Sequence, residues 1–216
     1  MPDLEYLKFE PDFASPSVIA AYDELPLWSA MFGLLLLEEV PLTGIRTALD
    51  AGCGTGFPLI ELAERLGRSA VVHGVDPWGA ALARAAEKVT CRGTLNVTLH
   101  EASATAMPFA DGHFDLIVSN LGLNNFDDRT GAVRECRRVA KKGSVLALTT
   151  NLQGHMRELY SIFEEVLTRR GLKDELLSLH EHVAHRATVA RCATCSCSES
   201  NSSFSPRRVS TSSKIE

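Results

Sequence analysis

The sequence predicts an α/β fold, with a doubly wound, mostly parallel sheet and helices on both of its faces. From Arg46 onward, short apolar runs alternate with longer amphipathic ones, as expected of repeated β-α units. A glycine-rich segment, Gly52 to Gly56, follows the first apolar run, and the acidic Asp76 ends the second. Because the carboxyl ends of parallel strands meet at one edge, these features predict a ligand-binding loop there.

The elements of this fold are expected in a regular order along the chain. Residues 16–40 should form one or two helices, since Pro26 and Pro41 interrupt the helical pattern. Leucine and alanine residues recur at helical spacing after the glycine-rich segment, up to Gly67. The expected strands cover residues 46–51, 70–75, 96–100, 114–119 and 144–149. Further helices are expected over residues 78–89, 127–140, 156–170 and 174–189.

The chain is expected to divide into an N-terminal helical cap (1–43), a Rossmann-like domain (44–190) and a Ser/Cys-rich tail (191–216). The tail contains nine serines and three cysteines and has neither strand nor helix periodicity. We expect it to be disordered or aberrant, for example through a shifted reading frame. The alternative is a zinc site of Cys192, Cys195 and Cys197 with His180, His182 or His185. No metal is expected, because the C-x-x-C-x-C spacing matches no standard zinc module.

Composition limits the possible function classes. Of the 216 residues, 45% are hydrophobic and 23% charged, as in globular proteins. The formal net charge of -5 argues against a nucleic-acid-binding face. The acidic start resembles no secretory signal, and the apolar run from Trp28 to Leu37 is too short to cross a bilayer. A cytoplasmic protein with no membrane partner is therefore expected.

The glycine-rich loop has the chemistry of a nucleotide-type site. Glycines allow a tight turn and a close approach of the backbone to a ligand, beside the unpaired N–H groups of a helix start. Asp76 is placed to accept hydrogen bonds from ribose hydroxyls. Phe57 stands where the dinucleotide fingerprint requires glycine, which disfavours a nicotinamide-dependent oxidoreductase. The charge of Asp50 would repel a pyrophosphate but attract an ammonium group.

Asp50 to Gly56 resembles the first motif of class I S-adenosylmethionine-dependent methyltransferases at every position. The resemblance covers roughly residues 15 to 190. It continues in Val75-Asp76-Pro77, Met107-Pro108-Phe109, residues 114–120, residues 135–139 and Lys142-Gly143. It implies S-adenosylmethionine as cofactor and a sheet of order 3-2-1-4-5-7-6, with the seventh strand antiparallel.

The resemblance also implies the cofactor contacts. The glycines would contact the methionine part, Asp76 the ribose, and Pro77 or Trp78 one adenine face. Ser103 stands where the family often has an aspartate that reaches the adenine amino group, so a lower cofactor affinity is expected. The full implied set is Asp50, Gly52, Cys53, Gly54, Gly56, Asp76, Pro77, Trp78, Ser103, Ala104, Asn120 and Leu121.

The methyl acceptor is expected to be a small molecule. Residues 120–125 lack the Asn/Asp-Pro-Pro-aromatic motif of many DNA and protein amide methyltransferases. Residues Tyr22, Trp28, Asn124 and His155 are candidates for the acceptor pocket. His155 is the candidate general base, although no catalytic residue is assigned. The alternative function is a non-catalytic binding or interaction protein that keeps the fold.

The end of the sheet is expected to depart from the family. The last two strands would lie beyond residue 190, where no apolar run could form a buried hairpin. The sheet should therefore stop at its fifth strand. That strand would leave an exposed edge, through which the chain could self-associate.

Overall fold

The computed structural model describes residues 11–24, 26–184 and 186, without the side chains of Leu27 and Trp28. The chain forms two units, Met1–Thr150 and Asn151–Glu216. This division falls at Thr150, whereas the sequence placed the domain end at residue 190. The predicted tail, 191–216, lies outside the described residues.

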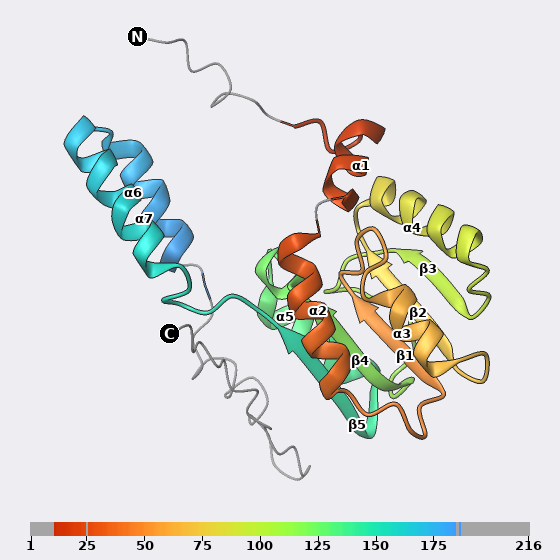
Figure 1. Ribbon diagram of the computed structural model, residues 1–216. Helices are drawn as coiled ribbons and strands as arrows, with labels where there is room; N and C mark the ends of the chain where they lie inside the picture. The colour runs from red at the N-terminus through yellow and green to blue at the C-terminus, as the bar shows by residue number, and fades with distance from the viewer. Residues whose placement is uncertain (1–10, 25, 185, 187–216) are drawn as a thin grey trace. The chain divides into compact units, whose positions relative to one another are not determined.

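The first unit contains the sheet and the helices that cover it (Figure 1). Its helices are α1 (Pro16–Glu24), α2 (Leu27–Glu39), α3 (Leu59–Leu66), α4 (Gly79–Arg92), the short η2 (Gly122–Asn124) and α5 (Arg129–Val139). Its strands are β1 (Thr47–Ala51), β2 (Val71–Asp76), β3 (Val97–Glu101), β4 (Phe114–Asn120) and β5 (Ala140–Thr149).

The sheet confirms the predicted fold class. Its five strands run in the order β3-β2-β1-β4-β5, and every neighbouring pair is parallel. The order reverses between β1 and β4, so the carboxyl ends of these strands open a crevice at the switch point. Within the described part of the chain, no strand pairs with the outer edge of β5.

Strand β5 begins earlier than the sequence predicted, at Ala140 instead of residue 144. Ala140 pairs with Phe114, and the register then shifts before Leu116 pairs with Val145. Gly143 has φ of 81°, a conformation that favours glycine and lets the backbone absorb the extra residues. Strands were predicted from runs of apolar residues. Because Lys141 and Lys142 are polar, this first part of the strand was not predicted.

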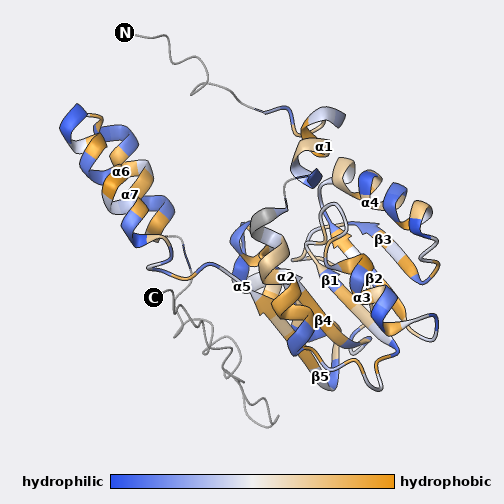
Figure 2. Cartoon of the chain, viewed as in Figure 1, coloured by the Kyte–Doolittle hydropathy of each residue, from blue (hydrophilic) through white to orange (hydrophobic). Residues whose placement is uncertain are grey.

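Buried apolar residues form two clusters, and the strands of the sheet are coloured largely as hydrophobic in Figure 2. One cluster joins β1, β2 and β4 to α2, α3 and α4, through residues such as Leu37, Leu62 and Leu82. A second cluster joins Leu49 of β1 to Cys136 and Val139 of α5 on the other face. The helices are therefore held on both sides of the sheet by alternate residues of the same strands.

One arginine fixes the chain between β3 and β4. The Arg138 guanidinium donates to the carbonyl oxygens of Phe109 (2.8 Å) and Met107 (3.2 Å). It also pairs with the carboxylates of Glu135 and Asp111. These bonds explain why Met107-Pro108-Phe109 and α5 belong to one structural unit, and they hold the segment that follows Ser103.

The second unit contains α6 (Arg157–Arg170) and α7 (Lys173–Ala184), joined by Gly171 at φ of 69°. Neither helix has a fully buried residue. No single helix in the described ranges is long and apolar enough to cross a bilayer. Helix α1 and residues Ser29–Glu39 reach the necessary length and apolar composition only when they are taken together, and the two are bent by 59° relative to each other. A cytoplasmic location therefore stays a prediction.

Candidate functional site

The glycine-rich loop joins the carboxyl end of β1 to α3. The N–H groups of Gly52 and Cys53 both donate to the carbonyl oxygen of Val75 in β2, at 2.8 and 3.2 Å. Gly52, Gly54 and Gly56 all have positive φ, of 80°, 50° and 100°. The loop is thus a turn that only glycines adopt at low cost, and it is anchored where the first two strands end.

Two of these glycines serve different purposes. A Cβ at Gly56 would lie 3.0 Å from Cδ1 of Ile60 and 3.2 Å from Cβ of Ala85, so glycine lets the loop pack on α3 and α4. Apart from Gly54 and its two chain neighbours, no described residue has an atom within 4 Å of a Cβ built on Gly54. Gly54 therefore presents an open face of bare backbone, the feature that a ligand approaching the loop requires.

Asp76 connects the end of β2 to this open face. Its Oδ2 accepts the N–H of Gly54 at 2.8 Å, and its Oδ1 accepts the N–H of Trp78 at 2.9 Å. Each carboxylate oxygen can accept two hydrogen bonds, so Asp76 keeps capacity for the hydroxyls of a ligand. It holds the loop and offers acceptors at the same place.

Asp50 belongs to β1, just before the loop, and is fully buried. Neither of its oxygens makes a hydrogen bond of ordinary geometry with a described residue. Burial, together with the negative charge of Asp76, raises its pKa to about 8, and the backbone N–H of Leu59 only partly opposes this. In the cofactor-free protein, Asp50 is therefore a buried carboxyl that keeps its proton at neutral pH.

The raised pKa of Asp50 predicts a pH-dependent stability in the cofactor-free protein. Between the unfolded value of 3.8 and the folded value of about 8, the unfolded carboxyl releases a proton that the folded one keeps. The free energy of unfolding should fall as pH rises through this range. We expect Asp50→Asn to remove this fall and to be more stable than the wild type by a few kcal/mol above about pH 8.

Urea unfolding at about pH 5 and about pH 8.5 measures this difference. Glu38→Gln is the control, because Glu38 is an exposed carboxylate of α2 outside the loop. If the free energy of unfolding changes equally with pH in the wild type and in Asp50→Asn, Asp50 is ionised in the folded protein across this pH range.

Aromatic side chains lie beside Asp76. The indole N–H of Trp78 donates to the Phe13 carbonyl oxygen at 2.8 Å, and its ring meets the Tyr22 ring edge-on with centroids 5.4 Å apart. Burial and the charge of Asp76 raise the pKa of the Tyr22 hydroxyl. Tyr22, predicted for the acceptor pocket, thus lies beside Trp78 and Asp76, which were predicted to bind the cofactor. The predicted Trp28 side chain is outside the described residues.

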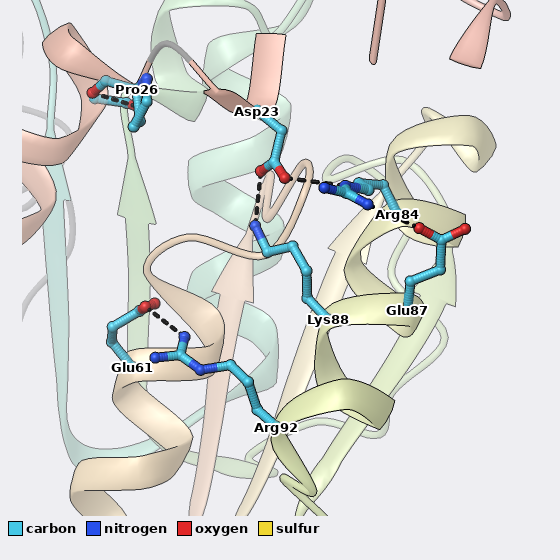
Figure 3. A network of polar contacts seen from close by, with 8 residues as sticks. Asp23, Pro26, Glu61, Arg84, Glu87, Lys88 and Arg92 are labelled. Atoms are coloured by element: carbon cyan, nitrogen blue, oxygen red, sulfur yellow. Dashed lines mark hydrogen bonds and ion pairs between the residues drawn. The ribbon is translucent and has the colours of Figure 1, made fainter. Parts of the chain in front are cut away.

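A carboxylate that the sequence analysis did not select fastens α1 to the site (Figure 3). Asp23 accepts hydrogen bonds from Lys88 at 2.7 Å and Arg84 at 3.0 Å, both on α4, and its side chain is only 12% exposed. Burial raises its pKa, but hydrogen bonds from Lys88, from the Thr55 hydroxyl and from Arg84 outweigh that effect and lower it. Asp23 therefore ties α1 to the glycine-rich loop as well as to α4.

The end of β4 borders the crevice from the other strand. The Asn120 amide donates to the Ser29 carbonyl oxygen at 2.9 Å and accepts from the Thr149 hydroxyl at 2.7 Å. Asn120 therefore ties α2 to β4 and β5, and its amide is engaged by the protein itself. Leu121 follows with φ of 60°, a strained conformation for a non-glycine residue. The predicted Asn124 accepts from the Thr150 hydroxyl at 2.7 Å.

A cavity of about 160 Å³ lies next to these residues. It brings together three predicted cofactor residues, Pro77, Ser103 and Ala104. Its remaining lining comes from Thr105 and from the segment between β4 and α5, namely Asn125, Phe126, Asp127 and Asp128. This second segment was missed because nothing in the sequence indicates that the chain before α5 reaches back to the loop after β3.

The candidate base His155 belongs to the second unit, whereas the residues of the loop, Asp76 and the cavity belong to the first. Burial, with the positive charge of Arg186, lowers the pKa of His155. No group of His, Cys, Asp and Glu side chains within the described ranges could hold a metal ion. Cys192, Cys195, Cys197 and His185 lie outside those ranges.

Comparison with known proteins agrees with this geometry. The sequence profile of a family described as methyltransferase domain matches residues 49–148, from the glycine-rich loop to the end of β5. Residues 49–148 therefore match a methyltransferase domain, and their fold is shared with an S-adenosylmethionine-dependent methyltransferase of known structure. A demethylmenaquinone methyltransferase of Anoxybacillus flavithermus is 38% identical to this chain over 124 residues, covering 56% of this chain and 52% of the relative.

Two further relatives of the methyltransferase domain extend the comparison. A malonyl-[acyl-carrier protein] O-methyltransferase of Coxiella burnetii is 35% identical and covers 67% of this chain and 48% of its own. The crystal structure of a SAM-dependent methyltransferase from Aquifex aeolicus is 27% identical, with a TM-score of 0.57, over 64% of this chain and 74% of that one. The chain spans about half the length of the curated relatives it matches.

The residues of the methyltransferase domain fit S-adenosylmethionine, the cofactor of the family. The open face at Gly54 allows the methionine part to approach the backbone. Asp76 retains acceptor capacity for the ribose, and the cavity with Pro77 and Phe126 offers apolar surface for a planar base. The individual contacts of the predicted cofactor residues stay predictions.

Proposed function

We propose that this chain transfers a methyl group from S-adenosylmethionine to a small-molecule acceptor. The observation that carries the proposal is the continuous series of features at the carboxyl edge of the sheet. An open glycine turn, a carboxylate with spare acceptor capacity and a cavity for a base follow one another there. This order corresponds to the methionine, ribose and adenine parts of one ligand.

The protein's contribution to such a reaction is alignment and exclusion of water. The bound cofactor supplies an electrophilic methyl carbon on a positively charged sulfur. Asp76 would fix the ribose, the glycines would admit the methionine part, and α1, fastened by Asp23, would cover the ribose side. No nucleophilic side chain is required, and we assign no catalytic residue.

The proposed class of acceptor is supported by the net charge of the chain and by the names of its relatives. The net charge of -5 disfavours nucleic acid. The two curated relatives are named for different acceptors, demethylmenaquinone and malonyl-[acyl-carrier protein]. We therefore propose a small-molecule acceptor as a class and take its identity from neither relative.

Turnover with a panel of acceptors tests the proposal. The full chain is incubated with S-adenosylmethionine and representative phenols, quinols, carboxylic acids and amines, and formation of S-adenosylhomocysteine is followed together with the mass gain of the acceptor. We expect both products with at least one acceptor class. Saturable cofactor binding with no turnover for any class would favour the non-catalytic alternative.

We further propose that the chain is cytoplasmic and self-associates through β5. The pairing of β5 supports self-association. Within the described residues β5 is paired only with β4, so the N–H and C=O groups on its outer edge can pair with another strand. Sedimentation velocity over a range of concentrations should show reversible association. A monomer at all concentrations would count against the sheet edge as an interface.

A further inference from the structure

The cavity beside Pro77 contains polar side chains that are already occupied by the protein. The Ser103 hydroxyl is 2.8 Å from the Thr105 hydroxyl and accepts the Thr105 N–H at 3.2 Å. Asp128 is the N-cap of α5, and its Oδ1 accepts the N–H of Gly131 at 2.8 Å. Both side chains therefore hold their own segments in place.

Asp127 differs from these neighbours. It lines the same cavity and is exposed, and among the described residues its side chain has no hydrogen-bond or ion-pair partner. An ionised carboxylate offers acceptors only, and it is a stronger partner for an N–H group than a hydroxyl is. Asp127 is thus the free carboxylate in the lining of this cavity.

The backbone around Asp127 is fixed on both sides. On one side, the N–H of Asn125 donates to the Gly122 carbonyl oxygen at 2.8 Å, and Phe126 packs against the glycine-rich loop. A Cβ at Gly52 would lie 3.2 Å from Cε1 of Phe126. On the other side, the cap formed by Asp128 begins α5. The backbone on both sides of Asp127 is therefore held, and its exposed side chain belongs to the lining of the cavity.

A bound adenine brings a requirement that this arrangement meets. Its exocyclic amino group donates two hydrogen bonds and needs an acceptor inside the cavity. We propose that Asp127, and not Ser103, accepts the hydrogen bond of the adenine amino group, so that the base is recognised from the segment before α5. This inference rests on the proposed function, since it concerns the adenine of that cofactor.

The test compares two ligands that differ at one position of the base. S-adenosylhomocysteine carries the 6-amino donor, and S-inosylhomocysteine carries a 6-oxo acceptor in its place. Calorimetry with the wild type should show a preference of at least about tenfold for the adenosyl ligand, since a carboxylate attracts a donor and repels an acceptor. Asp127→Ala should weaken the adenosyl ligand about tenfold, leave the inosyl ligand unchanged or tighter, and so remove the preference.

Two further variants make the result specific. Asp127→Asn should bind both ligands with similar affinity, because a carboxamide can turn to accept from the amino group or donate to the oxo group. Ser103→Asp in the Asp127→Ala background should restore the preference by supplying a carboxylate from the other segment of the cavity. Glu38→Ala, at an exposed position of α2 outside the cavity, should leave both affinities unchanged.

The outcomes separate this inference from the function on which it rests. If Asp127→Ala keeps both the affinity and the preference of the wild type, Asp127 does not recognise the base. The same conclusion follows if Ser103→Ala alone removes the preference. If the wild type binds neither ligand, the proposed function itself is wrong.

Discussion

We expect Gly54→Val to abolish binding of S-adenosylhomocysteine, with a loss of more than about a hundredfold in affinity. Gly54 has φ of 50°, and the space above it is open within the described structure. A valine side chain would fill the space through which the ligand meets the backbone. Its branched Cβ would also strain the turn, at a cost of about 1–3 kcal/mol. Isothermal titration calorimetry measures the affinity directly.

Gly112→Val is the matched control for this strain. Gly112 has φ of 61°, and no described atom lies within 4 Å of a Cβ built there, but it belongs to the turn before β4. Gly112→Val should lose stability by a similar amount while keeping cofactor affinity. If Gly54→Val shows a native circular dichroism spectrum and binds the cofactor normally, the loop is a turn without a binding role.

Asp76→Ala should weaken cofactor binding by about ten- to a hundredfold. The substitution removes the acceptor proposed for the ribose hydroxyls. It also frees the N–H groups of Gly54 and Trp78, which Asp76 accepts at 2.8 and 2.9 Å. The loop should therefore lose both a ligand contact and its own anchor, and the decrease should appear in the association constant from calorimetry.

Glu101→Gln is the control for negative charge near Asp76. Glu101 is the residue paired with Asp76 in the register of β2 and β3, so it lies at the same edge of the sheet. Affinity should change little in Glu101→Gln if Asp76 acts by direct contact. Equal affinities for the wild type and Asp76→Ala would contradict the ribose assignment.

The sequence was sufficient for the elements whose signals are local. Apolar runs located all five strands, and the spacing of glycines located the turn between β1 and α3. Pro26 separated α1 from α2, as its lack of an N–H predicts. The parallel order of the strands followed from the alternation of strands and helices.

The parts that the sequence did not predict depend on contacts between distant segments. Asp23 contacts α4 some 60 positions away, and nothing in its local sequence indicates the pairing with Arg84 and Lys88. Phe126 and Asp127 reach the cavity because of how the chain turns after β4. Asn120 shows the converse: its place after β4 was predicted, but its amide bonds to Ser29 and Thr149 were not.

Direct cofactor binding by the full chain tests the central claim, that the carboxyl edge of this sheet is an S-adenosylmethionine site. Calorimetric titrations of the wild type with S-adenosylmethionine, S-adenosylhomocysteine and NAD can be run in parallel under one set of conditions. We predict saturable binding of one S-adenosyl ligand per chain and no measurable binding of NAD. Binding of NAD, or no binding of either S-adenosyl ligand at millimolar concentration, would contradict the account.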